Sequence, residues 1–231
     1  MRSYGQYCSV AKALDVIGDR WTLLIVRELL AQGPTRYTDL RRGLPGIATN
    51  LLAERLRELE QAGIVLRQDA PPPIATALFS LTERGEQLRP VIDELGRWGI
   101  PLMTDTTPEE QYRSHWLQLP VDLYLSAPPE TEHAPTTIEV RAGDQPMLIE
   151  ARDGAITTRP GTSEQPDVAL SGPPQLVLGV LTGALDAEEA VGQGLAFEGD
   201  RQALTRLQHQ ERSGWQSGQR REAPMTDRAP A

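Results

Sequence analysis

The stretch from residue 35 to residue 67 constrains the fold of this 231-residue chain more than any other feature of the sequence. A first short helix is predicted to start at Thr35, with Tyr37 and Leu40 on a small apolar side. Gly43, Pro45 and Gly46 follow, and these residue types stop a helix and favour a tight turn. The chain is therefore expected to change direction just before residue 47.

A second helix is predicted directly after this turn, from about residue 49 to residue 62. Leu52, Leu56 and Leu59 recur at helical spacing and give it one apolar face, and Gly63 supplies a C-terminal cap. The opposite face is polar and carries Thr49, Asn50, Glu54 and Arg57. Two short helices joined by a tight turn form a helix-turn-helix, although a helix with one leucine face is also common on the surface of globular domains.

The segment after the second helix favours a DNA-binding interpretation over a purely structural one. In DNA-binding helix-turn-helix proteins, the first residues of the second helix contact base edges, where Asn suits adenine and Arg suits guanine; similar turns also occur in proteins that never bind DNA. Residues 64–67 and 76–81 are β-type runs separated by Pro71-Pro72-Pro73, which predicts a hairpin with a stiff tip, or wing. Thr82 then caps a predicted long helix that ends near Gly99 and Pro101.

Six motifs mark the first hundred residues: Tyr7-Cys8-Ser9-Val10, Leu14 to Ile25 (LDVIGDRWTLLI), Leu44-Pro45-Gly46-Ile47, Leu56-Arg57-Glu58-Leu59-Glu60, Ser80 to Gly85 (SLTERG) and Trp98-Gly99. In this order they resemble the HxlR family of winged-helix transcription regulators. The resemblance implies a small bacterial or archaeal dimeric regulator, related to the MarR type, that binds a palindromic operator. It also implies that the N-terminal segment and the long helix form the dimer interface, with Leu95 and Trp98 near the partner chain.

Eight residues are predicted to contact DNA: Arg36, Arg41, Arg42, Thr49, Asn50, Glu54, Arg57 and Arg67. The net charge of −9 and the pI near 4.9 argue against nucleic acid only if the chain is taken as a whole. Residues 1–104 hold 13 basic and 12 acidic side chains, whereas residues 105–231 hold 10 and 20. The near-neutral first half can therefore still present arginines to phosphate groups. Ala48 departs from the family, which commonly has Ser there as a helix cap; a cap by Thr49 or Asn50 would reduce their availability to bases.

The N-terminal residues 9–31 are predicted to form one or two helices. Their apolar positions Val10, Leu14, Ile17, Trp21 and Leu24 share a side, and we predict that they form the core beneath the helix-turn-helix. Cys8 has two interpretations. A lone Cys is most often a small buried apolar residue, and only Lys12 lies one helical turn away to stabilise a thiolate, whereas some members of the family use this Cys as a redox or electrophile sensor.

The sequence predicts neither an enzyme nor a metal or cofactor site. The three histidines, His115, His133 and His209, are far apart, and no phosphate-binding glycine loop or nucleophile motif is present. There is also no apolar run long enough to span a bilayer and no secretory signal, and the single Cys allows no internal disulfide. We therefore expect a cytoplasmic protein with no membrane partner.

A polar linker at residues 104–108 predicts a boundary to a second domain. A helix is predicted at 109–119, strands at 121–125, 137–142, 146–152, 155–158, 168–170 and 195–198, and helices at 175–182, 186–193 and 200–208. Asp153-Gly154, Gly199-Asp200 and Pro166 to Ser171 (PDVALS) resemble a sterol-carrier-protein type domain, which implies an apolar tunnel between sheet and helices. The candidate pocket residues are Leu176, Val177, Val180, Leu181 and Phe197, although any one of them more often simply fills a core.

The predicted fold class is therefore α+β. A winged helix-turn-helix domain for DNA binding and dimerisation occupies residues 1–104, a sterol-carrier-protein-like α+β domain with an antiparallel sheet occupies 109–209, and 210–231 is a disordered tail. The leading hypothesis is a homodimeric regulator that binds double-stranded DNA and senses a lipophilic small molecule. The alternative is a lipophile-binding or carrier module whose winged helix serves only for dimerisation, and specific, salt-sensitive DNA binding separates the two.

Overall fold

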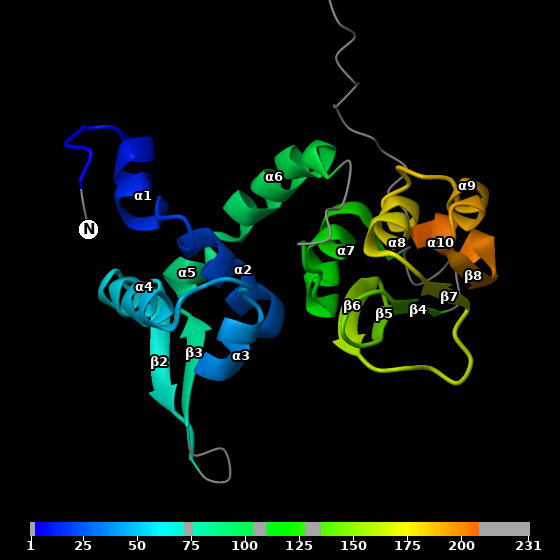
Figure 1. Cartoon of the computed structure of the whole chain (residues 1–231), viewed down its shortest axis with the longest axis horizontal. Helices are drawn as coiled ribbons and strands as arrows, with labels where there is room; N and C mark the ends of the chain where they lie inside the picture. Colours follow the sequence, from blue (N-terminus) through cyan, green and yellow to red (C-terminus); the bar gives the residue numbers. More distant parts are fainter. Residues whose placement is uncertain (1–2, 72–75, 104–109, 128–134, 208–231) are drawn as a thin grey trace, which may run out of the picture.

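The computed structural model describes residues 3–71, 76–103, 110–127 and 135–207, which form two regions with separate hydrophobic cores (Figure 1). The first region contains α1 (Ser9–Ile17), α2 (Thr22–Gln32), β1 (Thr35–Arg36), α3 (Tyr37–Arg42), α4 (Thr49–Gln61), β2 (Val65–Asp69), β3 (Ala77–Leu81), α5 (Glu83–Glu86), α6 (Arg89–Gly99) and the 3-10 turn η1 (Ile100–Leu102). The predicted linker at 104–108, the wing tip at 72–75 and the tail at 210–231 lie outside the described residues.

The second region contains the 3-10 turn η2 (Ser114–Leu117), α7 (Gln118–Tyr124), β4 (Thr136–Arg141), β5 (Met147–Arg152), β6 (Ala155–Pro160), β7 (Val168–Ser171), α8 (Pro174–Leu181), α9 (Ala187–Gly192), β8 (Ala196–Gly199) and α10 (Arg201–Leu207). Together the two regions confirm the predicted α+β class, with a winged helix-turn-helix followed by an α+β domain.

The helix-turn-helix and the wing form as predicted. Leu52, Leu56 and Leu59 on α4 are at most 2% exposed and pack into the N-terminal core. In the wing, β2 and β3 pair antiparallel from Val65 opposite Leu81 to Asp69 opposite Ala77. The leucine spacing therefore fixes the orientation of α4 on the domain, because burial of the leucine face is favourable and burial of the polar face is not.

The predicted helix start at Thr35 is wrong. Thr35 and Arg36 form the short strand β1, which pairs with β3 opposite Phe79 and Leu78. The hydroxyl of Thr35 donates a hydrogen bond to the carbonyl oxygen of Gly33 at 2.7 Å rather than capping a helix. By pairing with the edge of β3, β1 provides partners for backbone N–H and C=O groups of that edge. A helix starting at Thr35 would have left these groups unpaired.

The predicted long helix after the wing is broken in two. The side-chain oxygen of Thr82 accepts a hydrogen bond from the backbone N–H of Gly85 at 3.1 Å, so the predicted cap is confirmed. The helix that it caps, α5, nevertheless ends at Glu86, and α6 begins at Arg89. Pro90 lies in the first turn of α6. Proline has no backbone N–H, and the N–H groups of a first helical turn have no partner within the helix. Pro90 therefore favours the start of a second helix at this point.

Three of the predicted core residues on α1 and α2 are exposed instead. Val10, Leu14 and Leu24 are 64%, 42% and 37% exposed, and the prediction that they line the core is wrong. Ile17 is buried as predicted, and the fully buried apolar positions of α2 are Ile25 and Val26. Val10 and Leu14 are exposed because α1 projects away from the body of the domain (Figure 1).

The C-terminal sheet has five strands in the order β6-β5-β4-β7-β8. Three of its four pairings are antiparallel as predicted, and β4 pairs with β7 in parallel. The predicted turn between β5 and β6 is confirmed, since Asp153 and Gly154 both have positive φ values, 54° and 73°, as tight hairpin turns require. Apolar residues of η2, α7, α8, α9 and α10 pack with the sheet in one core.

The predictions for residues 109–125 are correct only in part, since residues 114–119 are helical as expected, in η2 and the start of α7. The described residues 110–113 are irregular, and the expected strand at 121–125 is mostly the helix α7. Leu117, Val121 and Leu125 pack into the C-terminal core, while Leu119 packs against the N-terminal core. Because the helix buries apolar residues on two sides, its sequence alternates like a strand and the pattern alone was misleading.

Candidate nucleic-acid interface and domain junction

The polar face of α4 is open to solvent. Asn50, Glu54 and Arg57 are exposed, and within the described part of the chain their side chains make no hydrogen bond or ion pair. The leucines on the other face are buried, so these side chains can approach a ligand without disturbing the core. A helix with a buried apolar face and an unengaged Asn near its start fits the recognition helix of a helix-turn-helix protein.

The first turn of α4 is fixed by α3 rather than by a capping side chain. Ala48 is the N-cap residue, and no side chain caps the helix there. The hydroxyl of Tyr37 donates to the backbone oxygen of Thr49 at 2.7 Å, and Nη1 of Arg41 donates to Oγ1 of Thr49 at 3.2 Å. Neither Thr49 nor Asn50 has therefore taken over the cap, and Asn50 stays available. The uncapped backbone N–H groups at this end also suit a phosphate.

Two arginines two positions apart on α4 have different roles. Arg55 is only 17% exposed in its side chain, and its Nη1 contacts both Asp19, before α2, and Glu58 on α4. Arg57 is exposed and points away from the core. Arg55 thus ties α4 to the first two helices, while Arg57 remains free for an external partner.

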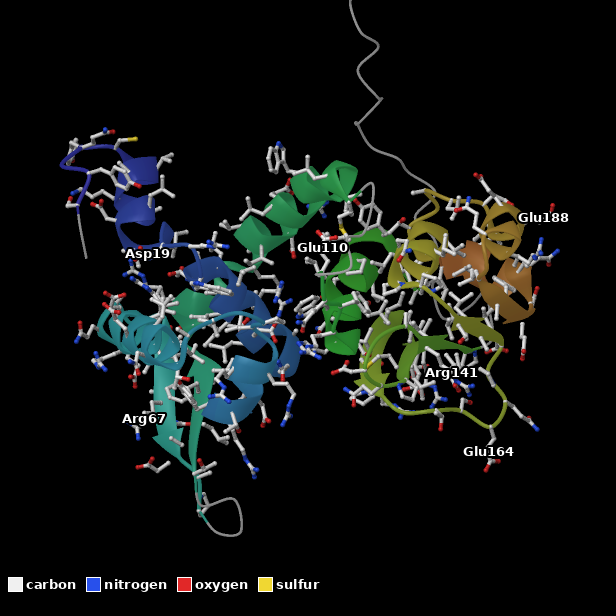
Figure 2. The ribbon with its side chains drawn as sticks, in the orientation of Figure 1. Asp19, Arg67, Glu110, Arg141, Glu164 and Glu188 are labelled. Atoms are coloured by element: carbon white, nitrogen blue, oxygen red, sulfur yellow. The ribbon has the colours of Figure 1, made fainter. Side chains whose placement is uncertain are left out.

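The structure divides the eight predicted DNA-contacting residues between two surfaces. Thr49, Asn50, Glu54 and Arg57 lie on α4, Arg41 contacts Thr49, and Arg67 lies on the exposed strand β2 of the wing (Figure 2). Arg36 and Arg42 line a cavity between α3 and the C-terminal domain. Contact of all eight residues with DNA stays a prediction. Arg36 and Arg42 differ from the other six residues because they face the cavity.

Cys8 is exposed and unpaired, so the buried interpretation is wrong. It precedes α1 directly, and the nearby backbone N–H groups of Ala11 and Val10 in the first turn of this helix lower the pKa of its thiol. Lys12 pairs with Asp15 at 3.7 Å. A sensing role for Cys8 stays a prediction.

The candidate apolar pocket residues form part of the C-terminal core. Leu176, Val177, Val180 and Leu181 on α8 are at most 7% exposed and belong to one cluster with the sheet, and Phe197 packs against that cluster. The cavity between α3 and the C-terminal domain is lined by other residues. Binding of an apolar ligand at α8 therefore stays a prediction, and it would require these side chains to separate from the sheet.

A buried glutamate that the sequence pattern did not predict lies at the junction of the two domains. Glu28, on α2, is fully buried, and its carboxylate accepts five hydrogen bonds. One oxygen, Oε1, accepts from Nε and Nη2 of Arg27 at 3.1 and 2.7 Å and from Nε1 of Trp116 at 2.7 Å. The other oxygen, Oε2, accepts from Gln32 and from Nε2 of His115, each at 2.7 Å. His115 and Trp116 belong to η2, so this carboxylate fastens α2 to the start of the second domain.

The surroundings of Glu28 keep its carboxylate charged. Burial raises the pKa of this carboxyl, but the hydrogen bond from His115 and the charge of Arg27 outweigh it, and the pKa lies below its usual value. The guanidinium of Arg27 also stacks 4.3 Å from the centre of the Trp116 ring. A Cβ at Gly43 would overlap the Glu28 carboxylate, so close packing requires a glycine at this position.

A sequence signal for this junction does exist. In TLLIVRELLAQ, the sequence of α2, Glu28 lies three residues after the buried Ile25 and next to the buried Leu29. A charged residue at a core position of a helix needs a partner, because an unpaired buried charge is very unfavourable. The sequence could have predicted that Glu28 has partners, but not that they come from residues 115 and 116.

Comparisons with known proteins match the two regions separately. The family described as HxlR-like helix-turn-helix matches residues 16–106, and the SCP-2 sterol transfer family matches residues 130–210. The HTH-type transcriptional regulator YodB of Bacillus subtilis is 38% identical over 101 residues, which cover 43% of this chain and 89% of that protein. The uncharacterized HTH-type transcriptional regulator YvaP of the same organism is 38% identical over 87 residues, which cover 38% of this chain and 80% of that protein.

Solved structures of similar proteins align with the same region. The reduced form of YodB from B. subtilis is 34% identical, covers 44% of this chain and 100% of its own, and has a TM-score of 0.38. The redox regulator HypR in its oxidized form is 34% identical, covers 43% of this chain and 100% of its own, and has a TM-score of 0.39. Within the described residues of the present chain, none of the helices is both long and apolar enough to cross a membrane.

Proposed function

The chain belongs to the HxlR-like helix-turn-helix family, and from this premise we propose that it is a transcription regulator that binds a palindromic operator as a homodimer. The observation that carries the proposal is the free polar face of α4, where Asn50 and Arg57 are exposed while the leucines beneath them are buried. These two residue types suit hydrogen bonding to adenine and guanine in the major groove. Arg67 on the wing supplies a positive charge for the neighbouring phosphates.

Exposed apolar side chains on two helices support the homodimer. On α6, Val91, Leu95 and Trp98 are 39%, 46% and 70% exposed, and on α1 Val10 and Leu14 are exposed as well. Apolar residues grouped along helices mark an interaction surface in a monomer. A two-fold dimer formed through α1 and α6 would place two copies of α4 on one side of the DNA, with half-sites centred about 10 base pairs apart or a multiple of that.

Replacing Asn50 or Arg57 by alanine tests DNA recognition. Each variant should fold normally, because neither side chain contacts the core, and should lose about 1–3 kcal/mol of operator affinity with relaxed specificity at one base position. The measurement is a mobility shift with DNA from the region flanking the gene. Arg152→Ala, which removes an exposed arginine of the second domain, is the matched control and should bind operator normally. Unchanged binding in both the Asn50→Ala and the Arg57→Ala protein would refute the assignment of α4.

A second function is favoured by the match of residues 130–210 to the SCP-2 sterol transfer family. We propose that the C-terminal domain takes a lipophilic effector between α8 and the sheet, where Leu176, Val177, Val180 and Leu181 provide an apolar lining. Such a ligand can change DNA affinity only if it interacts differently with the free and the DNA-bound protein. If operator binding proved absent, the same ligand would instead support a carrier module whose winged helix serves only for dimerisation.

A further inference from the structure

We propose that the cavity between α3 and the second domain binds a small anion that carries a carboxylate or a phosphate group. The cavity has a volume of about 300 Å³, at the lower end of ligand pockets. One wall comes from the N-terminal domain and includes Arg36 and Arg42, and the other comes from the second domain and includes Arg113, His115 and Gln145. It is distinct from the apolar core around α8.

The charges that line the cavity leave it positive. Its two acidic residues already have partners, because Asp39 pairs with Arg42 at 3.1 Å and Asp144 accepts the backbone N–H of Ser114 at 3.0 Å and lies 3.8 Å from Arg113. In the described part of the chain, the side chain of Arg36 has no ion pair or hydrogen bond. With three arginines against two aspartates, the lining carries an excess positive charge even when His115 is neutral.

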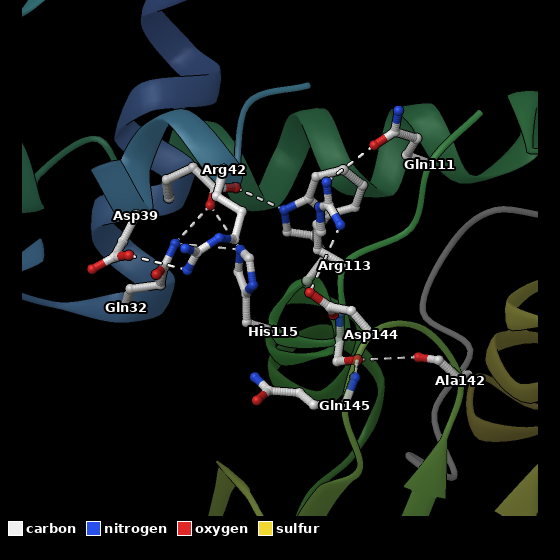
Figure 3. Close-up of polar contacts among 12 residues, drawn as sticks. Gln32, Asp39, Arg42, Gln111, Arg113, His115, Ala142, Asp144 and Gln145 are labelled. Atoms are coloured by element: carbon white, nitrogen blue, oxygen red, sulfur yellow. Dashed lines mark hydrogen bonds and ion pairs between the residues drawn. The ribbon is translucent and has the colours of Figure 1, made fainter. Parts of the chain in front are cut away.

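Hydrogen-bond donors around the cavity are only partly used. Arg113 donates from Nη2 to Gln111 at 3.1 Å, and its Nε is buried without a partner (Figure 3). The amide side chain of Gln145 makes no hydrogen bond within the described residues, although its backbone N–H donates to Oγ of Ser114 at 3.0 Å. His115 donates from Nε2 to Glu28, so its neutral ring adds no donor to the cavity. An anion with several oxygen atoms matches these donors, since guanidinium groups bind carboxylate and phosphate in bidentate fashion.

The position of the cavity gives the anion a consequence for DNA binding, and this part of the inference rests on the proposed function. An anion held by Arg36 and Arg42 on one side and Arg113 on the other would link the helix-turn-helix to the second domain. It would also neutralise two arginines that could otherwise approach DNA phosphates. The anion should therefore bind the DNA-free protein more tightly than the DNA-bound protein, and this difference should lower operator affinity.

Direct titration of the full-length protein tests the site without DNA. Inorganic phosphate and citrate are the two probes, each followed by calorimetry at constant ionic strength. The wild type should bind one or both saturably, and Arg113→Gln should weaken that binding about tenfold or more, because it removes a charge-assisted hydrogen bond. Arg152→Gln removes an exposed arginine of the same domain outside the cavity and should bind as the wild type does. Gln145→Leu, whose amide is not engaged with the described residues, provides a second variant of the same wall and should also weaken binding.

The outcomes separate the two ligand classes and the two proposals. Saturation by phosphate alone assigns phosphate esters, and saturation by citrate alone assigns carboxylates. Saturable binding of neither probe, or binding that is equally tight in the wild type and in folded Arg113→Gln and Gln145→Leu proteins, would overturn the site. Because no DNA is present, that failure would leave the proposed role of Asn50 and Arg57 untouched. A mobility shift with and without the bound probe then measures how much the anion lowers operator affinity. Arg113→Gln should reduce this effect of the anion and should bind operator as the wild type does when no anion is present.

Discussion

The two domains treat their apolar side chains in opposite ways. Among the described residues, all the large exposed apolar side chains except Val191 precede residue 104, and most of them lie in the N-terminal segment, on α1 and on or just after α6. The C-terminal domain instead buries its apolar residues between one sheet and its helices. The exposed apolar residues of the first domain are those that the proposed homodimer would cover, whereas the second domain completes its core within the chain.

The contact between the domains belongs to neither pattern. Gly96 on α6 lets Leu119 and Leu123 of α7 approach, since a Cβ there would lie 3.1 and 3.2 Å from their methyl groups. Beside this apolar contact, the buried carboxylate of Glu28 gathers His115 and Trp116. Polar groups that are fully paired fix one geometry, because any shift leaves a buried partner unsatisfied. The junction is therefore expected to hold the two domains in a defined orientation.

The largest expected effect comes from breaking the apolar surface of the first domain. Leu95→Asp places a charge on the exposed face of α6 and should convert a dimer to a monomer, since an apolar interface cannot bury an unpaired carboxylate. Loss of the second half-site contact should lower operator affinity by about 10²–10⁴-fold. Light scattering at micromolar concentration measures the mass, and the same substitution at the exposed Val191 of the second domain is the control. A Leu95→Asp protein that remains dimeric would remove α6 from the interface.

The next effect concerns the polar junction. Glu28→Ala should lower the free energy of unfolding by about 3–5 kcal/mol, because it leaves the buried donors of Arg27 and Trp116 without an acceptor. Urea unfolding measures the change. Glu94→Ala, at an exposed glutamate of α6, is the control and should change stability by no more than about 0.5 kcal/mol. Equal stability of the two variants would show that the junction does not stabilise the protein.

The same carboxylate predicts the direction of a pH dependence. The pKa of Glu28 is lower in the folded protein than in the unfolded chain, so its contribution is complete above the ordinary glutamate pKa of about 4.3 and is lost as the pH falls through the lowered value. Unfolding curves recorded from neutral to acidic pH should therefore show a loss of stability in wild type that Glu28→Ala lacks. Parallel pH profiles of the two proteins would contradict the lowered pKa.

The smallest effect tests whether the closed C-terminal core opens for a ligand. A fatty-acyl compound bound near α8 is expected to change operator affinity by a factor of about 5–150. Val177→Phe fills part of that space and should abolish the response, whereas Val191→Phe, on the exposed side of α9, should retain it. The readout is operator affinity with and without the compound, together with fluorescence of a bound fatty-acyl probe. A compound that binds neither the wild type nor the control would leave the second domain without a lipophilic effector.

Local patterns made the helix-turn-helix and the wing predictable. Leu52, Leu56 and Leu59 indicate a helix because residues three and four positions apart share a face. The wing is predictable because its two strands are close to each other in the chain. The same reasoning failed for α7, whose two buried sides imitate a strand, and for Val10 and Leu14, whose apolar character is not covered within one chain. A sequence pattern shows that a residue is apolar, but not which molecule covers it.

The sequence by itself determined the type of the first domain and the polar face of α4, because these depend on spacing within a few turns of helix. Only the tertiary structure decided that Glu28 meets His115, which lies 87 positions away, and that Arg36 and Arg42 face a cavity while Arg57 faces solvent. Such contacts depend on how two separately folded cores dock, and no short-range periodicity encodes that arrangement. The charge of a buried residue predicts that a partner exists, and the fold alone selects it.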